Sequence, residues 1–190
     1  LSSLFLFAFS CSETSIDKAN DAYLKETINY QSKNIYGFEN LFDGRITSQV
    51  DQNVFGVLHF PNNYDASRQY PLVIASHGSS NWRDHHRRYL EQMRQADYLV
   101  FAIHPFDSRD VSSTVGNQIN VTSETVIYEM AQALNLMSKD SRVDNQKIFA
   151  AGWSLGGTAS LFNGWIPLQD EIHDEGCLLY TSDAADDKQC

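Results

Sequence analysis

The sequence predicts an α/β protein with a mostly parallel sheet, and three observations support this expectation. Three apolar runs of strand length, at 72–76, 98–103 and 147–151, lack polar alternation, which is typical of strands covered on both faces. Segments with helical character follow or separate these runs. The order strand, helix, strand, helix, strand, helix predicts right-handed crossovers in a doubly wound, three-layer arrangement.

The first segment, 1–11, is an uncharged apolar run that is too short for a membrane span. It resembles the apolar core of a bacterial lipoprotein signal, with Cys11 as the lipidated residue. Ala8 and Phe9 match the usual pattern before such a cysteine poorly, so a cleaved secretory signal and an ordinary buried segment stay open. A signal of either kind implies an exported protein, with membrane attachment only through a lipid on Cys11.

The next segment, 12–34, is polar, and we expect a tether with at most one short helix. Strand patterns begin with the predicted domain, 35–176. Within it, 38–42 and 54–60 are expected to form an antiparallel pair around an intervening Asp-Gly turn.

Two helices are expected between the three apolar strands. The second begins near Thr122 and Ser123, which can cap it. The first, 82–96, carries the adjacent residues His85 and His86, which point about 100° apart on a helix and cannot bind one metal as an i, i+4 pair. We therefore expect a solvated helix face there and no metal.

The composition indicates a single domain and argues against some kinds of binding partner. The chain has 190 residues, of which 42% are hydrophobic and 20% charged, enough for one domain with a core. A net charge of -10 without a basic run argues against nucleic acid. The cysteines Cys11, Cys177 and Cys190 lie near the two ends and suggest neither a disulfide framework nor a metal site.

The strand at 147–151 leads into the run Gly152-Trp153-Ser154-Leu155-Gly156-Gly157. This Gly-x-Ser-x-Gly run is typical of a nucleophile elbow when a strand precedes it and a helix follows. The serine of such a turn has a strained backbone, and its neighbours two residues away need to lack side chains. We expect Ser154 to be the nucleophile and the Leu155 amide to bind an oxyanion. The motif is short and also arises by chance, so its flanking elements carry the prediction.

The strand at 72–76 ends in His77-Gly78-Ser79-Ser80-Asn81. In an acyl-transfer enzyme of this architecture, the loop after the third strand supplies the second oxyanion-hole amide. Ser79 or Ser80 is the expected donor, through its backbone N–H. A plain strand-to-helix turn with Asn81 as N-cap is compatible with that role.

Segments that leave the carboxyl ends of strands lie where open α/β sheets bind ligands. The pocket residues expected on this ground are His77, Trp82, Arg83, His104, Phe106 and Arg109.

Taken together, these residues resemble the α/β-hydrolase superfamily, and within it the dienelactone hydrolases, over roughly 35–175. The segments that carry the resemblance are 72–80, 85–89, 106–116 and 142–157. The resemblance implies an enzyme that hydrolyses a small-molecule ester or a related acyl bond without a cofactor. The founding dienelactone hydrolases use a cysteine, so Ser154 implies an esterase of broad type. A non-catalytic surface lipoprotein that binds a ligand or partner in the same pocket is the alternative.

In this family the catalytic acid and histidine lie after later strands, beyond the elbow helix. The run Cys-Leu-Leu-Tyr-Thr-Ser-Asp-Ala-Ala-Asp-Asp within 177–190 resembles the translation of a sequencing-library adapter. We therefore expect the native sequence to end near Gly176, so that the chain holds the N-terminal portion of the fold and is inactive alone. A genuine polar tail is the alternative. Without a following strand, 148–151 would form an exposed apolar sheet edge.

Overall fold

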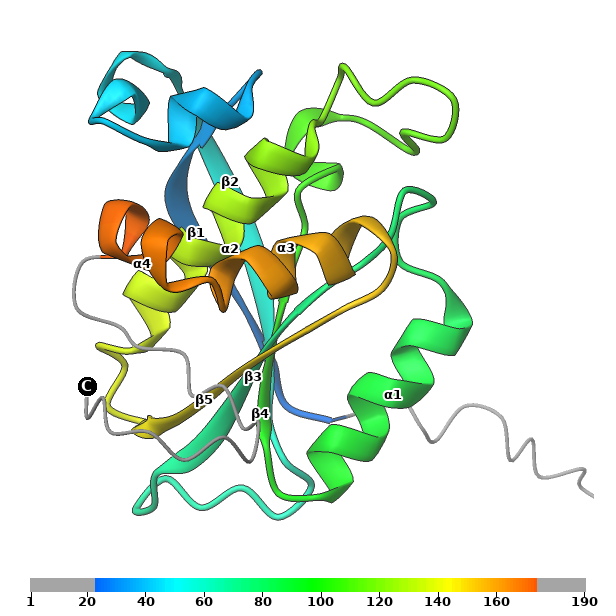
Figure 1. Cartoon of the computed structure of the whole chain (residues 1–190). Coiled ribbons are helices and arrows are strands. Elements are labelled where there is room, and N and C mark those ends of the chain that lie inside the picture. The colour runs from blue at the N-terminus through cyan, green and yellow to red at the C-terminus, as the bar shows by residue number, and fades with distance from the viewer. Residues whose placement is uncertain (1–22, 174–190) are drawn as a thin grey trace, which may run out of the picture.

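The computed structural model describes residues 23–173, which form a five-stranded sheet with helices on both faces (Figure 1). The α/β class predicted from the sequence is confirmed. Along the chain the elements are β1 (Lys25–Asn34), η2 (Phe38–Leu41), η3 (Arg45–Ser48), β2 (Val50–His59), β3 (Tyr70–Ser76), α1 (Asp84–Gln95), β4 (Leu99–Ile103), η4 (Asp107–Arg109), α2 (Ser123–Met137), β5 (Val143–Gly152), α3 (Leu155–Asn163) and α4 (Ile166–Ile172).

The sheet has the strand order β1-β2-β4-β3-β5. β4, β3 and β5 are parallel, as the sequence predicts, and β1 and β2 extend the sheet as an antiparallel pair beside β4. The carboxyl ends of parallel strands lie at the same edge of a sheet. The loops after β3, β4 and β5 therefore leave the same edge, where open α/β sheets bind ligands.

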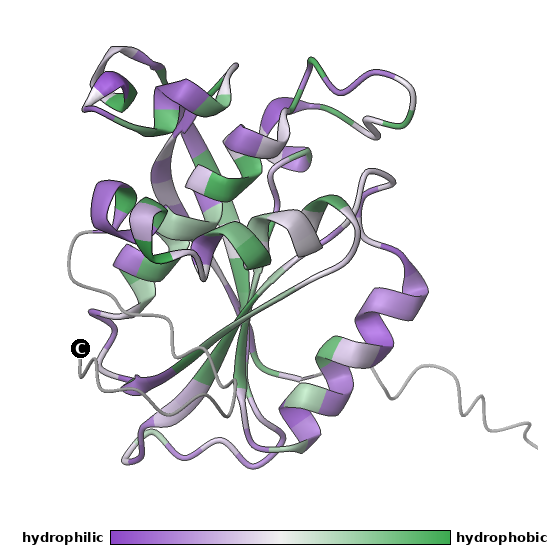
Figure 2. Ribbon diagram, viewed as in Figure 1, coloured by the Kyte–Doolittle hydropathy of each residue, from purple (hydrophilic) through white to green (hydrophobic). Residues whose placement is uncertain are grey.

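Each face of the sheet has its own core, because successive side chains of a strand point to opposite faces. On one face, Leu72 and Ile74 of β3 pack with the apolar sides of α2, α3 and α4. On the other face, Ala75 and Val100 pack with Leu90 of α1. Figure 2 shows hydrophobic residues along the central strands and mostly hydrophilic residues on α1.

Helix α2 begins at Ser123, where the sequence predicts it. The side chain of Thr122 caps the helix, since its Oγ1 accepts a hydrogen bond from the Thr125 N–H at 3.1 Å. Thr125 Oγ1 accepts a second bond from the Ile35 N–H at 2.9 Å. The cap therefore also joins the start of α2 to the residue after β1.

Two predictions for the N-terminal region are wrong. Residues 25–34, assigned to the tether, form β1, so the sheet begins at Lys25 and not at residue 35. Residues 38–42, expected as a strand, contain the 3₁₀ helix η2, and β2 pairs with β1 instead. Only Tyr30 and Ser32 of β1 are buried, which is why its sequence shows no clear apolar pattern.

Several predictions concern residues outside the described range. These are the signal-like segment with Cys11, the first part of the tether and the tail at 177–190. Over residues 23–173, the helices are too short or too polar to cross a bilayer.

A buried ion pair joins α2 to the segment after β4, and its arginine also bonds the last residue of β1. Arg109 Nη1 donates to Glu129 Oε2 at 2.7 Å, and Arg109 Nε donates to Asn34 Oδ1 at 2.7 Å. The two charged side chains are 6% and 0% exposed. Burial raises the pKa of Glu129 to about 7, although Arg109 opposes this shift.

The raised pKa of Glu129 predicts a pH-dependent stability. Folded Glu129 retains a proton that the unfolded chain releases near pH 4.5. Its contribution to the stability of the folded state is therefore complete below pH 4.5 and is lost as the pH rises to about 7. Between these values the free energy of unfolding should fall by up to about 3 kcal/mol, and Glu129→Gln should remove this decrease. Urea denaturation of the parent and of Glu129→Gln at several pH values measures how steeply the free energy of unfolding changes with pH in each protein. Equal slopes for parent and variant would contradict the assignment.

β5 is an edge strand of the sheet formed by the described residues. It pairs with β3 on one side, and no described strand pairs with its other side. Its last residues include Ile148, Phe149, Ala150 and Ala151. Unpaired backbone groups beside apolar side chains can pair with another chain.

We predict that the 190-residue chain aggregates when it is expressed alone, because no strand among residues 23–173 covers this edge of β5 against intermolecular pairing. Size-exclusion chromatography and denaturant unfolding test this. A monodisperse chain that unfolds cooperatively would contradict the prediction.

Candidate active site

Ser154 lies at the turn from β5 into α3. Its backbone has φ 52° and ψ -112°, which is a strained conformation for a residue with a side chain. The serine is exposed, and Leu155 begins α3, where backbone N–H groups have no helical acceptor. The strained strand-to-helix turn predicted from the sequence is confirmed. It places an exposed hydroxyl at the start of a helix.

Two glycines allow the backbone to approach itself at this turn. A Cβ atom on Gly152 would lie 2.0 Å from the Gly156 carbonyl oxygen. A Cβ atom on Gly156 would lie 2.3 Å from the Ser76 carbonyl oxygen. Gly157 is less restricted, with the nearest atom 3.3 Å from such a Cβ. Gly152 and Gly156 are therefore required by contacts between backbone atoms, which cannot move aside as side chains do.

The loop after β3 lies directly against the elbow. A Cβ atom on Gly78 would be 2.9 Å from the Trp153 carbonyl oxygen and 3.2 Å from Ser154 Cβ. The Trp153 N–H also donates to the Ser76 carbonyl at 3.3 Å. The two loops that the sequence singled out are thus in contact, with Gly78 beside Ser154.

The carbonyl of Gly78 is fixed by two donors. It accepts from the Asn81 N–H at 3.0 Å and lies 2.8 Å from His77 Nδ1. In a trans peptide the C=O and N–H groups point in opposite directions. The Ser79 N–H therefore points away from the Asn81 amide and the His77 ring.

The next peptide is fixed in the same way. The Ser79 carbonyl accepts from the Thr114 N–H and from Ser113 Oγ, both at 2.9 Å. The Ser80 N–H accordingly points away from the 113–114 segment. Over residues 23–173, neither the Ser79 nor the Ser80 N–H has a hydrogen-bond acceptor. Two amides of fixed orientation, in the loop whose Gly78 lies against Ser154, are the kind of donors that an oxyanion hole needs.

Three of the predicted pocket residues have buried side chains, and their contact with a substrate stays a prediction. Phe106 is fully buried, with its ring centre 4.5 Å from that of His77. His77 is also fully buried, and burial lowers its pKa to about 4, so its neutral ring donates from Nδ1 to the Gly78 carbonyl. Arg109 forms the ion pair with Glu129. These three side chains therefore pack in the interior of the protein.

The other three predicted pocket residues lie nearer the surface. Trp82 is half-buried and donates from Nε1 to the Ile103 carbonyl at 3.1 Å. Arg83 is exposed at the start of α1. The side chain of His104 is 18% exposed, and its Nδ1 lies 2.7 Å from Asp107 Oδ2. Their proposed contact with a substrate stays a prediction.

Two side chains of the candidate site, His86 and Asp107, were not predicted from the sequence. The expected solvated face of α1 includes His86, which is buried with its ring centre 4.9 Å from that of Trp153. Burial lowers the pKa of His86, and its Nδ1 accepts from the Arg83 N–H at 3.0 Å. The pairing of Asp107 with His104 was also not predicted, although an aspartate three residues after a histidine is visible in the sequence.

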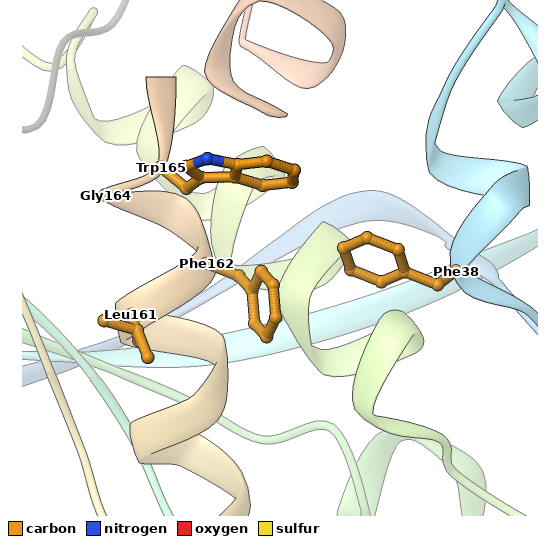
Figure 3. A pocket seen from close by; sticks show the side chains of 5 residues that line it. All are labelled: Phe38, Leu161, Phe162, Gly164 and Trp165. Atoms are coloured by element: carbon orange, nitrogen blue, oxygen red, sulfur yellow. The ribbon is translucent and has the colours of Figure 1, made fainter. Parts of the chain in front are cut away.

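A hollow of about 470 Å³ lies away from the elbow, between η2 and the C-terminal end of α3 (Figure 3). Its lining consists of Phe38, Leu161, Phe162, Gly164 and Trp165. Ser154 is at the opposite end of α3, so the hollow is not part of the elbow. Over residues 23–173, no three His, Cys, Asp or Glu side chains are grouped as metal ligands.

No family model and no curated protein matches the sequence. Solved structures match the fold. A lipase/esterase from Lactobacillus plantarum is 14% identical with a TM-score of 0.53, over 83% of this chain and 57% of its own. A dienelactone hydrolase from Klebsiella pneumoniae is 16% identical with a TM-score of 0.48, over 75% and 57%. The acylaminoacyl peptidase of Pyrococcus horikoshii is 13% identical with a TM-score of 0.45, over 72% and 20%.

The chain thus spans little more than half the length of the esterase whose fold it shares. At such low identity the similarity shows the fold alone. The predicted α/β-hydrolase fold is confirmed by this comparison and by the mixed, mainly parallel sheet.

We predict that Gly156→Ala destabilises the protein by about 3 kcal/mol or more, because the new methyl group meets the Ser76 and His77 carbonyl oxygens. Gly37→Ala is the matched control, since the three atoms nearest its new methyl group belong to the flexible Glu39 side chain. Denaturant unfolding and soluble yield compare the two. Equal stability of both variants would show that the close approach at the elbow is not a constraint.

Proposed function

We propose that this chain is part of a serine hydrolase of the dienelactone hydrolase type, which cleaves carboxylic esters or related acyl bonds with Ser154 as nucleophile. The observation that carries the proposal is the strained, exposed Ser154 with Gly78 packed beside it. A strained turn costs about 1–3 kcal/mol and is typical of functional sites. Nothing in the packing of an exposed serine explains that cost.

In the proposed reaction, Ser154 Oγ attacks the acyl carbon and transfers its proton to a general base. The carbonyl oxygen gains the negative charge, which the Leu155 N–H and the Ser79 or Ser80 N–H stabilise. The intermediate then expels the alcohol, which takes the proton from the base. Water hydrolyses the acyl-serine by the same steps in reverse, and no cofactor takes part.

Over residues 23–173, no histidine ring forms a hydrogen bond with Ser154. All six histidines of the sequence lie in this range, and His85 is exposed on α1. The other five have ring-nitrogen partners other than Ser154: His59 with Tyr23, His77 with Gly78, His86 with Arg83, His104 with Asp107 and His173 with Asn163. We therefore propose that the triad histidine and acid come from native chain beyond Gly176.

The remaining expectations are part of the same proposal. The substrate is a small molecule, nucleic acid is not a partner, and the protein is exported, either as a periplasmic or membrane-anchored lipoprotein with its lipid on Cys11 or as a secreted protein. These rest on the acidic charge and on the apolar segment before Cys11.

A fluorophosphonate probe tests the nucleophile in protein that carries its native continuation beyond Gly176. We expect covalent labelling of the parent and none of Ser154→Ala, since the probe reacts with an activated serine. Ser160→Ala is the matched control on the same helix, because Ser160 Oγ donates to the Gly156 carbonyl and has no role in the reaction.

Labelling that persists in Ser154→Ala would place the nucleophile elsewhere. A folded parent with a complete triad and no labelling would favour the non-catalytic surface lipoprotein.

A further inference from the structure

One carboxylate joins the loop after β3 to the loop after β4. Asp107 Oδ1 accepts from Asn81 Nδ2 at 2.7 Å, and Asp107 Oδ2 lies 2.7 Å from His104 Nδ1. The three residues come from two strand ends that are neighbours in the sheet. The arrangement is therefore a bridge between the two loops, built from side chains only.

The charges of this bridge follow from its surroundings. Burial lowers the pKa of His104, so the ring is neutral at pH 7 and donates from Nδ1 to the carboxylate. Burial alone would raise the pKa of Asp107, but the bonds from His104 and Asn81 outweigh it and lower the pKa. An ionised acceptor makes both bonds charge-assisted, and such bonds are stronger than neutral ones.

His104 is a fixed anchor for the bridge. Its backbone N–H donates to the Phe55 carbonyl at 3.1 Å. Its ring is stacked on the Phe55 ring, with centres 4.9 Å apart. The β4 side of the bridge is therefore attached to the sheet itself.

Asn81 forms the other end of the bridge. It adopts φ 65°, a left-handed conformation that asparagine tolerates better than most residues. Its N–H closes the turn onto the Gly78 carbonyl, and its Oδ1 accepts from the Trp82 N–H at 2.6 Å. The bond to Asp107 is the contact by which the Asn81 side chain attaches this turn to the β4 loop.

This turn carries the amides proposed to bind the oxyanion. Ser79 and Ser80 lie between Gly78, which is packed against Ser154, and Asn81, which is held by Asp107. A displacement of the turn would change the distance between these amides and Ser154 Oγ. A misplacement of about 1 Å in an active site can cost about 100-fold in rate.

We propose that Asp107 is a positioning residue, which holds the Ser79–Ser80 amides opposite Ser154 by bonding Asn81 and His104 at once. The proposal rests on the proposed serine hydrolase function. Asp107 does not touch the reacting atoms, and its effect reaches them through the turn.

A donor–acceptor exchange tests this in protein with its native continuation beyond Gly176. Asn81→Asp keeps an acceptor for the Trp82 N–H and a residue that tolerates positive φ, but it sets two carboxylates against each other. We expect kcat for p-nitrophenyl acetate to fall about 10- to 100-fold, with KM changed less than about threefold. The double variant Asn81→Asp/Asp107→Asn restores a donor and an acceptor and should recover kcat to within about threefold of the parent.

Asp110→Asn is the control, because Asp110 is an exposed carboxylate with φ 54° in the same loop and takes no part in the bridge. It should leave kcat unchanged. A merely structural role would lower stability without the selective loss of kcat and without its recovery in the double variant. Unchanged kcat in Asn81→Asp, or no recovery in the double variant, would overturn the proposal while leaving the hydrolase function intact.

Amide hydrogen exchange of the peptide covering 77–82 gives a readout that does not need catalysis. We expect faster exchange in Asn81→Asp and parental exchange in the double variant. Identical exchange in all three proteins would overturn the proposal even if the parent proved inactive, whereas an inactive parent with the expected exchange pattern would count against the hydrolase function alone.

Discussion

The close approach of three backbone segments at the elbow is the constraint on which the rest of the structure depends. Gly156 lies against the carbonyls that end β3, and Gly152 lies against Gly156. Strand β5 can therefore turn into α3 beside the end of β3 only if both positions lack a side chain. This contact fixes where α3 starts, and it brings the loop after β3 to Ser154.

The strain at Ser154 is stabilised by what surrounds it. On one face of the sheet, α3 packs on α2 and on the main core. On the other face, Trp153 packs against Trp82 and His86 of the α1 region. The residue before the serine and the helix after it are thus held on opposite sides of the sheet. A single serine with φ 52° persists because both of its neighbours are anchored in cores.

The sequence predicts the central sheet well, because its strands are continuous apolar runs and its turns contain glycine. The elbow and the loop after β3 were found from such local signals. β1 was missed, since an edge strand with only Tyr30 and Ser32 buried needs little apolar pattern. The burial of Arg109 could not be predicted either, because its partner Glu129 is distant in the sequence and meets it only in the folded chain.

The bridge formed by Asn81, Asp107 and His104 was not predicted either, because its partners also meet only in the folded chain. Asn81, His104 and Asp107 each have an ordinary local explanation, as a turn residue, a loop histidine and a helix-start acid. Only the parallel pairing of β3 and β4 brings their loops together. The polar part of the candidate site therefore depends on tertiary contacts, while its glycines and serine are determined by the local backbone.

A crystal structure of a phosphonate adduct, made with protein that carries its native continuation beyond Gly176, would show directly whether Ser154 and the two loops form the active site. We expect phosphorus bonded to Ser154 Oγ, with the phosphonyl oxygen about 2.7–3.1 Å from the Leu155 N and from the Ser79 or Ser80 N. A phosphonyl oxygen directed into solvent, or an adduct on a residue other than Ser154, would contradict this expectation.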